Sequence, residues 1–183
     1  MIKSNIKLLV LSFLLIISLR PLQSAEMADP IKVDWSFKGL TGTFDRASLQ
    51  RGFQVYKEVC ASCHSMQYLS YRNLGETGGP EFSEQEVKAI AASFEIEDGP
   101  DSQGEMFTRP GKPSDKFKSP YPNVQAATAA NGGAYPPDMS VLVKARKGGA
   151  NYIYSVLVGY EDPPTGVTLD DGVYYNKYMT GNK

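Results

Sequence analysis

The sequence predicts a mostly α-helical domain whose helices are joined by long, ordered loops. Apolar residues recur at spacings of three and four in several segments, as on the buried face of a helix. The 17 glycines and 12 prolines favour long loops between those helices. A chain of 183 residues is long enough to bury one sizeable core. We therefore expect one helical domain in which the loops carry much of the chemistry.

The N-terminal residues have the layout of a secretory signal peptide: a basic start, an apolar middle of 12 residues and small residues at the end. The apolar run, 8–19, is shorter than the about 20 residues that a membrane-spanning helix needs. We expect a signal peptide over residues 1–25 and one domain over residues 26–183. The alternative is that the segment is not cleaved and stays as a membrane anchor. A cleavage after Ala25 would put Gln23 at a position where signal peptides usually have a small residue.

Charge excludes one class of function. Removing residues 1–25 takes away three of the 19 basic residues and none of the 20 acidic ones, so the net charge falls from −1 to −4. A nucleic-acid-binding protein would need a basic patch, so nucleic-acid binding is disfavoured. No second long apolar stretch follows the first, so we expect no C-terminal membrane anchor within the chain as given.

Residues 29–43 predict an extended arm, and residues 45–62 predict the first helix of the domain. The helix has an apolar stripe with spacings of four, three and four, made by Leu49, Phe53, Tyr56 and Cys60. The stripe leads directly into the most informative motif of the chain. These side chains would pack either in the core or against whatever that motif binds.

Both cysteines and the one histidine of the chain lie in Cys60-Ala61-Ser62-Cys63-His64. This C-x-x-C-H run is the attachment signature of a c-type haem. Residues three and four apart share one helix face, so the two thiols and the imidazole can point at one object. Cys60 and Cys63 would bond covalently to the haem vinyl groups, and His64 would bind the iron. The motif therefore predicts one covalent haem c.

Three other uses of the motif are weaker. A structural zinc site needs four nitrogen or sulfur ligands, and the chain has three such residues. A thioredoxin-like thiol pair would give no role to His64. A plain disulfide between Cys60 and Cys63 would not explain why His64 directly follows them.

The second helix is expected over residues 83–96. Ser83 and Glu86 form a capping-box pattern at its start, and Val87, Ile90, Ala91 and Phe94 make its buried stripe. Residues 81–105, here called the acidic segment, hold eight acidic residues and one lysine, a net charge of −7. The segment is either a solvated surface or a docking field for a basic partner.

The remaining segments alternate between loops and short helices. Residues 107–122 contain four prolines and predict a loop. Shorter helices are expected over residues 124–130, 138–147 and 151–160, the last with Ile153, Val156, Leu157 and Tyr160 on one face. Residues 163–172 predict another loop, and residues 173–178 an aromatic-rich end.

Several segments together resemble the cytochrome c1 family. They are GFQVYKEVCASCHSM (residues 52–66), AANGGAYPPD (129–138), YIYSVLVGY (152–160) and PPTG (163–166). The resemblance covers about residues 33–178. It implies a class I c-type cytochrome fold, mostly α, with long loops wrapped around a covalently attached haem.

The resemblance also suggests residues around the haem. Arg146 would face a haem propionate; from the sequence alone it is equally a basic residue at a helix C-terminus. Tyr56, Pro137 and Tyr152 would line the haem crevice, or would simply be core residues. These four roles come from the family and not from spacing.

The second axial ligand is a further expectation. In the family it is a methionine in an Ile-x-Met-Pro-like segment that follows the Tyr174–Tyr178 stretch. The resemblance therefore places it beyond Lys183, in a chain that reads as a C-terminally truncated family member. The alternative is a shortened variant that uses Met179 or leaves the sixth site open.

By resemblance, the chain is the electron-transfer subunit of the respiratory cytochrome bc1 complex. Its haem would take one electron from the Rieske iron–sulfur protein and pass it to soluble cytochrome c, beside cytochrome b in a membrane-associated, dimeric complex at the periplasmic face of the bacterial inner membrane. The subunit alone would not be catalytic. The alternatives are a free periplasmic monohaem cytochrome, a secreted thiol–disulfide enzyme and a non-functional remnant.

Overall fold

The computed structural model describes residues 27–183, so the predicted signal peptide over residues 1–25 lies outside the described residues. The described chain forms two compact units. The larger unit is Lys32–Asn151, and the smaller one consists of residues 27–31 and Tyr152–Lys183. Each unit is described by itself below.

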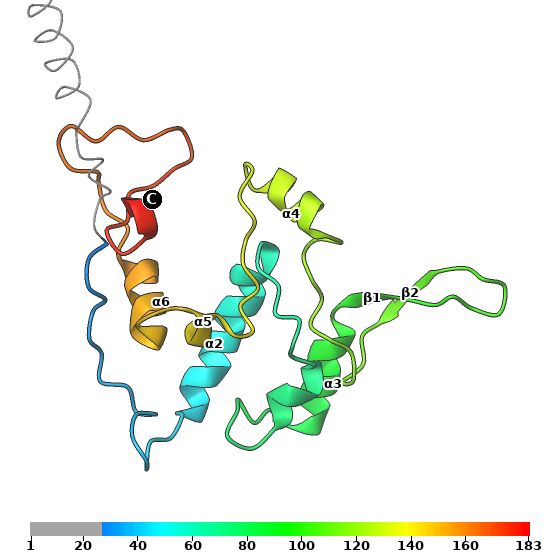
Figure 1. Ribbon diagram of the computed structural model, residues 1–183. Helices are drawn as coiled ribbons and strands as arrows, with labels where there is room; N and C mark the ends of the chain where they lie inside the picture. The colour runs from blue at the N-terminus through cyan, green and yellow to red at the C-terminus, as the bar shows by residue number, and fades with distance from the viewer. Residues whose placement is uncertain (1–26) are drawn as a thin grey trace, which may run out of the picture. The chain divides into compact units, whose positions relative to one another are not determined.

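In the larger unit, helix α2 (Arg46–Glu58) begins where the sequence predicts (Figure 1). Asp45 is its N-cap, because its carboxylate accepts a hydrogen bond from the Ser48 backbone N–H at 2.7 Å. The prediction of a helix as far as residue 62 is wrong in its last turn. Val59 has φ −122° and ψ −64°, outside the helical region, and a 3₁₀ helix, Cys60–Ser62, follows it.

Helix α3 (Glu84–Ala92) has the predicted capping box: the Ser83 hydroxyl accepts from the Glu86 N–H, and the Glu86 carboxylate accepts from the Ser83 N–H at 2.8 Å. Val87 and Ala91 are buried as expected. The prediction of helix as far as residue 96 is wrong.

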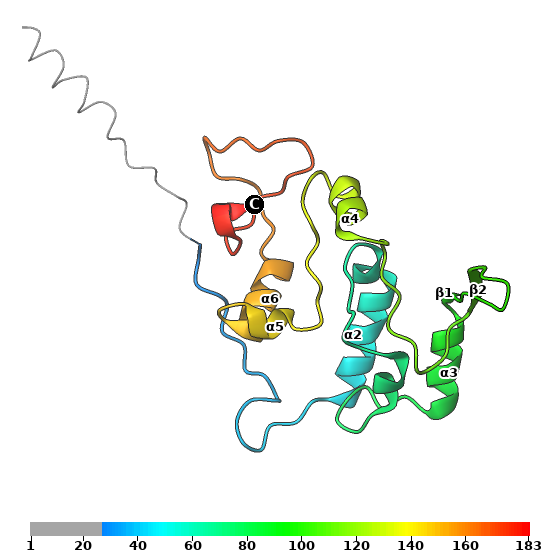
Figure 2. The ribbon, with the colours of Figure 1, turned by 45° about the vertical axis from the view of Figure 1, so that its right-hand side comes forward.

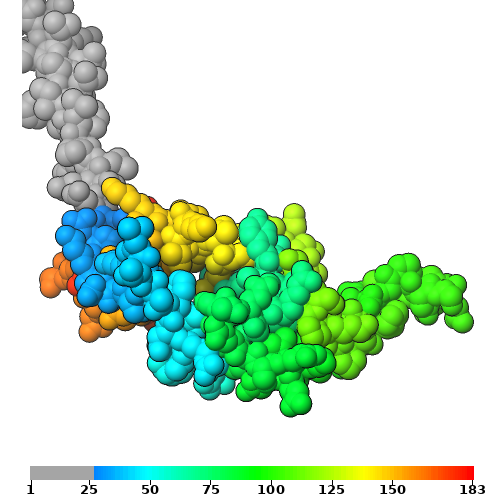
Figure 3. Space-filling view, turned by 90° about the horizontal axis from the view of Figure 1, so that it is seen from below, coloured from blue at the N-terminus to red at the C-terminus, as the bar shows by residue number. Residues whose placement is uncertain are grey.

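An antiparallel hairpin of β1 (Glu95–Asp98) and β2 (Phe107–Pro110) follows α3, with Glu95 opposite Pro110. The expected loop over residues 107–122 therefore begins with a strand. Figure 2 shows the hairpin continuing directly from α3, and Figure 3 shows it as a projection from the body of this unit.

The other helices are short. Helix α4 (Val124–Ala130) matches the prediction in both bounds, with Asn123 as its N-cap. Helix α5 (Leu142–Ala145) is much shorter than the expected 138–147, and α6 (Gly149–Val158) begins and ends two residues earlier than expected. Two 3₁₀ helices, Tyr71–Gly75 and Thr180–Asn182, were not predicted.

The core of the larger unit is aromatic. Tyr71 is 1% exposed and stacks on Phe94 and Phe117, with ring centroids 5.2 and 4.9 Å apart. Tyr56 also stacks on Phe117, with ring centroids 5.9 Å apart. This stack connects α2 with the segment after the hairpin. Three residues of the stripe predicted for α2 therefore face the core: Phe53, Tyr56 and Cys60. The fourth, Leu49, is half-buried and lies outside this cluster.

The smaller unit is held by polar groups. The Ser155 hydroxyl of α6 accepts from the Ile31 N–H at 2.8 Å, and the fully buried Asn176 donates to the Val156 carbonyl, also at 2.8 Å. The predicted apolar face of this helix is only partly correct, because Leu157 is 68% and Tyr160 54% exposed. The described chain is thus mostly helical, as predicted, with a single two-stranded hairpin. None of its helices is long and apolar enough to cross a membrane.

Candidate functional site

The two cysteines lie on one tight turn at the end of α2. The carbonyl of Cys60 accepts hydrogen bonds from the backbone N–H groups of both Cys63, at 3.1 Å, and His64, at 2.8 Å. This shared acceptor holds the three residues of the motif on one turn. Both cysteines are free, partly buried thiols rather than a disulfide. Within residues 27–183, no group of three His, Cys, Asp or Glu side chains is arranged to hold a metal ion.

The imidazole of His64 is fixed by a residue far along the chain. Its Nδ1 lies 2.8 Å from the backbone carbonyl oxygen of Pro137. A carbonyl can only accept, so Nδ1 carries the proton and donates it. In the neutral ring the other nitrogen, Nε2, then keeps its lone pair free for a metal. Histidine ligands in metalloproteins are oriented in this way.

The structure therefore brings three of the predicted groups together: the thiols, the imidazole and Pro137. Tyr56 lies beside them, with its Oη 3.5 Å from the His64 carbonyl oxygen, a long hydrogen bond. Burial raises the pKa of Tyr56 to about 12, so its hydroxyl stays protonated and able to donate.

An open cleft of about 980 Å³ lies next to the motif. Cys63 is on its wall, while Cys60 and His64 are not among its lining residues. The opposite wall comes from α4 and the segments on either side of it, with Tyr121, Pro122, Ala127, Tyr135 and Pro136. Its size falls in the range of cofactor pockets. Two thiols, one oriented imidazole and an aromatic, proline-lined cleft are a donor set that suits a covalent haem.

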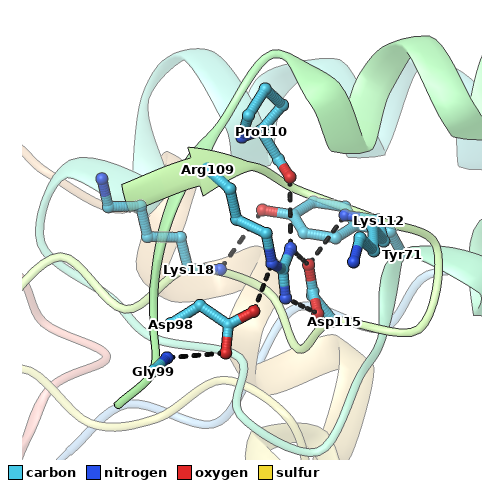
Figure 4. Close-up of polar contacts among 8 residues, drawn as sticks. All are labelled: Tyr71, Asp98, Gly99, Arg109, Pro110, Lys112, Asp115 and Lys118. Carbon is cyan, nitrogen blue, oxygen red and sulfur yellow. Dashed lines mark hydrogen bonds and ion pairs between the residues drawn. The ribbon is translucent and has the colours of Figure 1, made fainter. Parts of the chain in front are cut away.

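Arg109 of β2 also lines this cleft, and Figure 4 shows its polar contacts. Its guanidinium is ion-paired with Asp98 and with both oxygens of Asp115, at 2.6 and 3.0 Å. These hydrogen bonds raise the pKa of Arg109 and lower the pKa of Asp115 to about 2. The arrangement joins the hairpin to the turn that precedes Phe117.

The other predicted site residues are Arg146, Tyr152 and Met179. Arg146 is exposed at the end of α5, where its guanidinium is 3.4 Å from the Ala145 carbonyl. Tyr152 and Met179 belong to the smaller unit, in which Met179 Sδ is 3.8 Å from the Tyr160 hydroxyl. The haem-site roles of Arg146, Tyr152 and Met179 stay predictions.

Sequence reasoning missed Asp138. Its carboxylate accepts hydrogen bonds from the Ser65 hydroxyl at 2.7 Å and the Gln67 N–H at 2.9 Å. Burial opposes its ionisation, but hydrogen bonds from Ser140, Gln67 and Ser65 outweigh that effect and lower the pKa of Asp138 to about 2. The available signal was an acidic residue directly after Pro136-Pro137, which entered the predictions only as the start of a helix and as the last residue of a segment typical of the family.

A helical chain with two thiols and one imidazole on a single turn is the arrangement typical of c-type haem proteins. The cytochrome c1 family model matches residues 35–183. The chain is 55% identical over 147 residues to cytochrome c1-2, heme protein, mitochondrial, of Solanum tuberosum, covering 80% of this chain and 55% of that protein. It is 48% identical over 167 residues to cytochrome c1 of Rhodospirillum rubrum, covering 82% and 60%.

A third relative is the cytochrome b-c1 complex catalytic subunit, mitochondrial, of Candida albicans, at 51% identity over 153 residues, covering 83% of this chain and 52% of that protein. The chain belongs to the cytochrome c1 family. It spans about half the length of these relatives.

Proposed function

We propose that this chain carries one covalent haem c and transfers electrons as the haem subunit of a respiratory cytochrome bc1 complex. The observation that carries the proposal is the turn 60–64, where both thiols are free and the His64 imidazole is held by the Pro137 carbonyl. Membership of the cytochrome c1 family supports the same function.

The proposed domain is a class I c-type cytochrome fold over residues 26–183, preceded by a signal peptide over residues 1–25. In it, Cys60 and Cys63 would hold the haem, because their free S–H groups can add across the two vinyl groups of the porphyrin. Each addition forms one carbon–sulfur bond and moves the hydrogen to the other vinyl carbon, so no oxidant is needed. His64 Nε2 would hold the iron, and the Nδ1–H···O=C bond of its ring would make the imidazole a stronger electron donor.

When bound, the haem supplies one-electron redox chemistry, and the protein supplies orientation, burial and docking. The proposed donor is the Rieske iron–sulfur protein, and the proposed acceptor is a soluble cytochrome c. The proposed assembly is a dimeric, membrane-associated complex that also contains cytochrome b, at the periplasmic face of the bacterial inner membrane. The name of the Candida albicans relative, cytochrome b-c1 complex catalytic subunit, includes cytochrome b and supports that partner.

The test is expression of the chain in a host that attaches haem c. We expect a reduced-state absorption spectrum of c-type haem and haem that stays with the protein after denaturation. The double variant Cys60→Ser with Cys63→Ser should lose all covalent haem, because both thioether sulfurs are gone.

Ser62→Ala is the matched control. The Ser62 hydroxyl lies 3.7 Å from Cys63 Sγ on the same turn, so this change perturbs the turn while leaving both thiols in place. It should keep covalent haem. Covalent haem on the double serine variant, or none on the unaltered chain, would refute the proposal.

A further inference from the structure

Two segments more than 70 residues apart run side by side next to the candidate iron ligand. They are residues 64–68, after the motif, and residues 137–140, after the double proline. Two hydrogen bonds join the segments. The Met139 N–H donates to the Ser65 carbonyl at 2.8 Å, and the Tyr68 N–H donates to the Ser140 hydroxyl at 3.1 Å. The contact between His64 and Pro137 lies at one end of this pairing.

Asp138 is the centre of the pairing. One carboxylate oxygen accepts from both the Ser65 hydroxyl and the Gln67 backbone N–H, on the motif side. The other oxygen accepts from the Ser140 backbone N–H at 2.8 Å, on its own side. Asp138 therefore holds the two segments together right beside the His64–Pro137 contact. It follows Pro137 directly, and its partner Ser65 follows His64 directly.

We infer that Asp138 is a positioning residue for the iron ligand, which acts by holding the Pro137 carbonyl against His64 Nδ1. Pro137 has no N–H of its own with which to anchor its position, so its carbonyl depends on the residues that follow. The adjacent carboxylate, with three hydrogen bonds, is that anchor. This inference rests on the proposed function, because it concerns the ligation of haem iron by His64.

The anchor has a chemical consequence beyond stability. A well-aligned Nδ1–H···O=C bond increases the electron donation of the imidazole, which favours ferric over ferrous iron. If the Pro137 carbonyl moves away, that donation weakens. The reduction potential should then rise, and the imidazole plane should lose its fixed orientation.

The experiment compares haem-loaded Asp138→Asn with the unaltered chain. An amide nitrogen cannot accept the hydrogen bonds that the carboxylate accepts, although the shape of the side chain is nearly the same. We expect the ferrous-to-ferric ratio at a fixed applied potential to rise by roughly three- to tenfold; tenfold corresponds to about 59 mV for a one-electron couple. The haem methyl signals in the NMR spectrum of the ferric protein should also shift, because they report the orientation of the imidazole.

The matched control is Asp101→Asn, in the hairpin. The Asp101 carboxylate also accepts from two backbone N–H groups, those of Gln103 and Glu105, at 2.7 and 3.0 Å. The substitution removes the same charge and alters a carboxylate that also accepts backbone hydrogen bonds, but Asp101 makes no contact with the motif. The control should therefore leave the potential and the haem methyl signals unchanged.

Ser65→Ala provides a milder variant in case Asp138→Asn does not fold. It removes one of the three contacts of the carboxylate, so its effect on the potential should be smaller and in the same direction. Variants that lose stability but keep the original potential and haem methyl signals would overturn the inference while leaving the proposed function intact. A lack of covalent haem on the unaltered chain would overturn both.

Discussion

Arg109 and Asp115 show how single side chains support the wall of the cleft. Asp115 is 15% exposed at the side chain and accepts from both the guanidinium of Arg109 and the Lys112 backbone N–H. The ion pair has no equivalent in the unfolded chain. The stability that it gives is therefore linked to the protonation of Asp115.

The sign of this linkage predicts acid sensitivity. The pKa of Asp115 is about 2 in the folded protein, and an unfolded Asp has a pKa of about 3.9. The stabilisation is complete above about pH 4 and is lost as the pH falls toward about 2. Urea unfolding followed by circular dichroism should show a loss of about 1–2 kcal/mol from this group over that interval.

Asp115→Asn should be less stable than the unaltered chain near neutral pH and should depend less steeply on pH below about pH 4. Asp171→Asn, an exposed change in the smaller unit, serves as the control and should keep the original profile. Equal acid dependence in the unaltered chain and in Asp115→Asn would mean that other carboxylates dominate.

Residue by residue, the sequence predicted the local geometry of the motif better than its surroundings. The spacing of Cys60, Cys63 and His64 is a local property, and a local turn does hold them. The partner of His64 is 73 residues away. No local pattern reports such a contact, because it depends on how two loops pair in the folded chain. Asp138 was missed for the same reason.

At the scale of elements, local signals defined some helices well. Helix α4 matches in both bounds, because Asn123 caps its start and Asn131-Gly132 ends it. The hairpin was missed because its strands, EIED and FTRP, are short, polar and contain a proline, which are weak strand signals. The Arg109–Asp98 ion pair joins the two strands of this hairpin, and the strand sequences alone do not predict it.

The capping box of α3 gives a prediction for an element. Ser83→Ala removes the hydroxyl that caps the Glu86 N–H, so the free energy of unfolding should fall by about 1 kcal/mol. Ser102→Ala, in the exposed turn of the hairpin, is the control and should change stability much less. Urea denaturation measures both. An equal, small effect of the two changes would show that the box contributes little.

For the whole molecule, the acidic segment carries less free charge than its sequence suggests. Of its eight acidic residues, Glu81, Glu84 and Asp98 are in ion pairs with Arg46, Lys88 and Arg109. Two of these basic partners come from outside the segment, so they reduce the net charge of −7 locally. The exposed Glu97 of β1 is a good site at which to test the docking hypothesis.

If a basic cytochrome c docks at the acidic segment, its rate of electron transfer with the haem-loaded chain should fall as ionic strength rises from about 0.01 to about 0.15 M. Glu97→Gln should lower the rate at low salt and make the salt dependence shallower. Asp171→Asn removes the same charge from the smaller unit and should have a weaker effect. A rate that does not change with salt would count against docking by charge.

The contact of His64 with Pro137 also sets an order of events during synthesis. His64 leaves the ribosome 73 positions ahead of the carbonyl that fixes its imidazole. Until then a neutral imidazole can carry its proton on either nitrogen. Sulfur attachment needs only the short motif, but the choice of the iron-binding nitrogen waits for a later part of the chain. His64 is thus synthesised well before the group that fixes its ring.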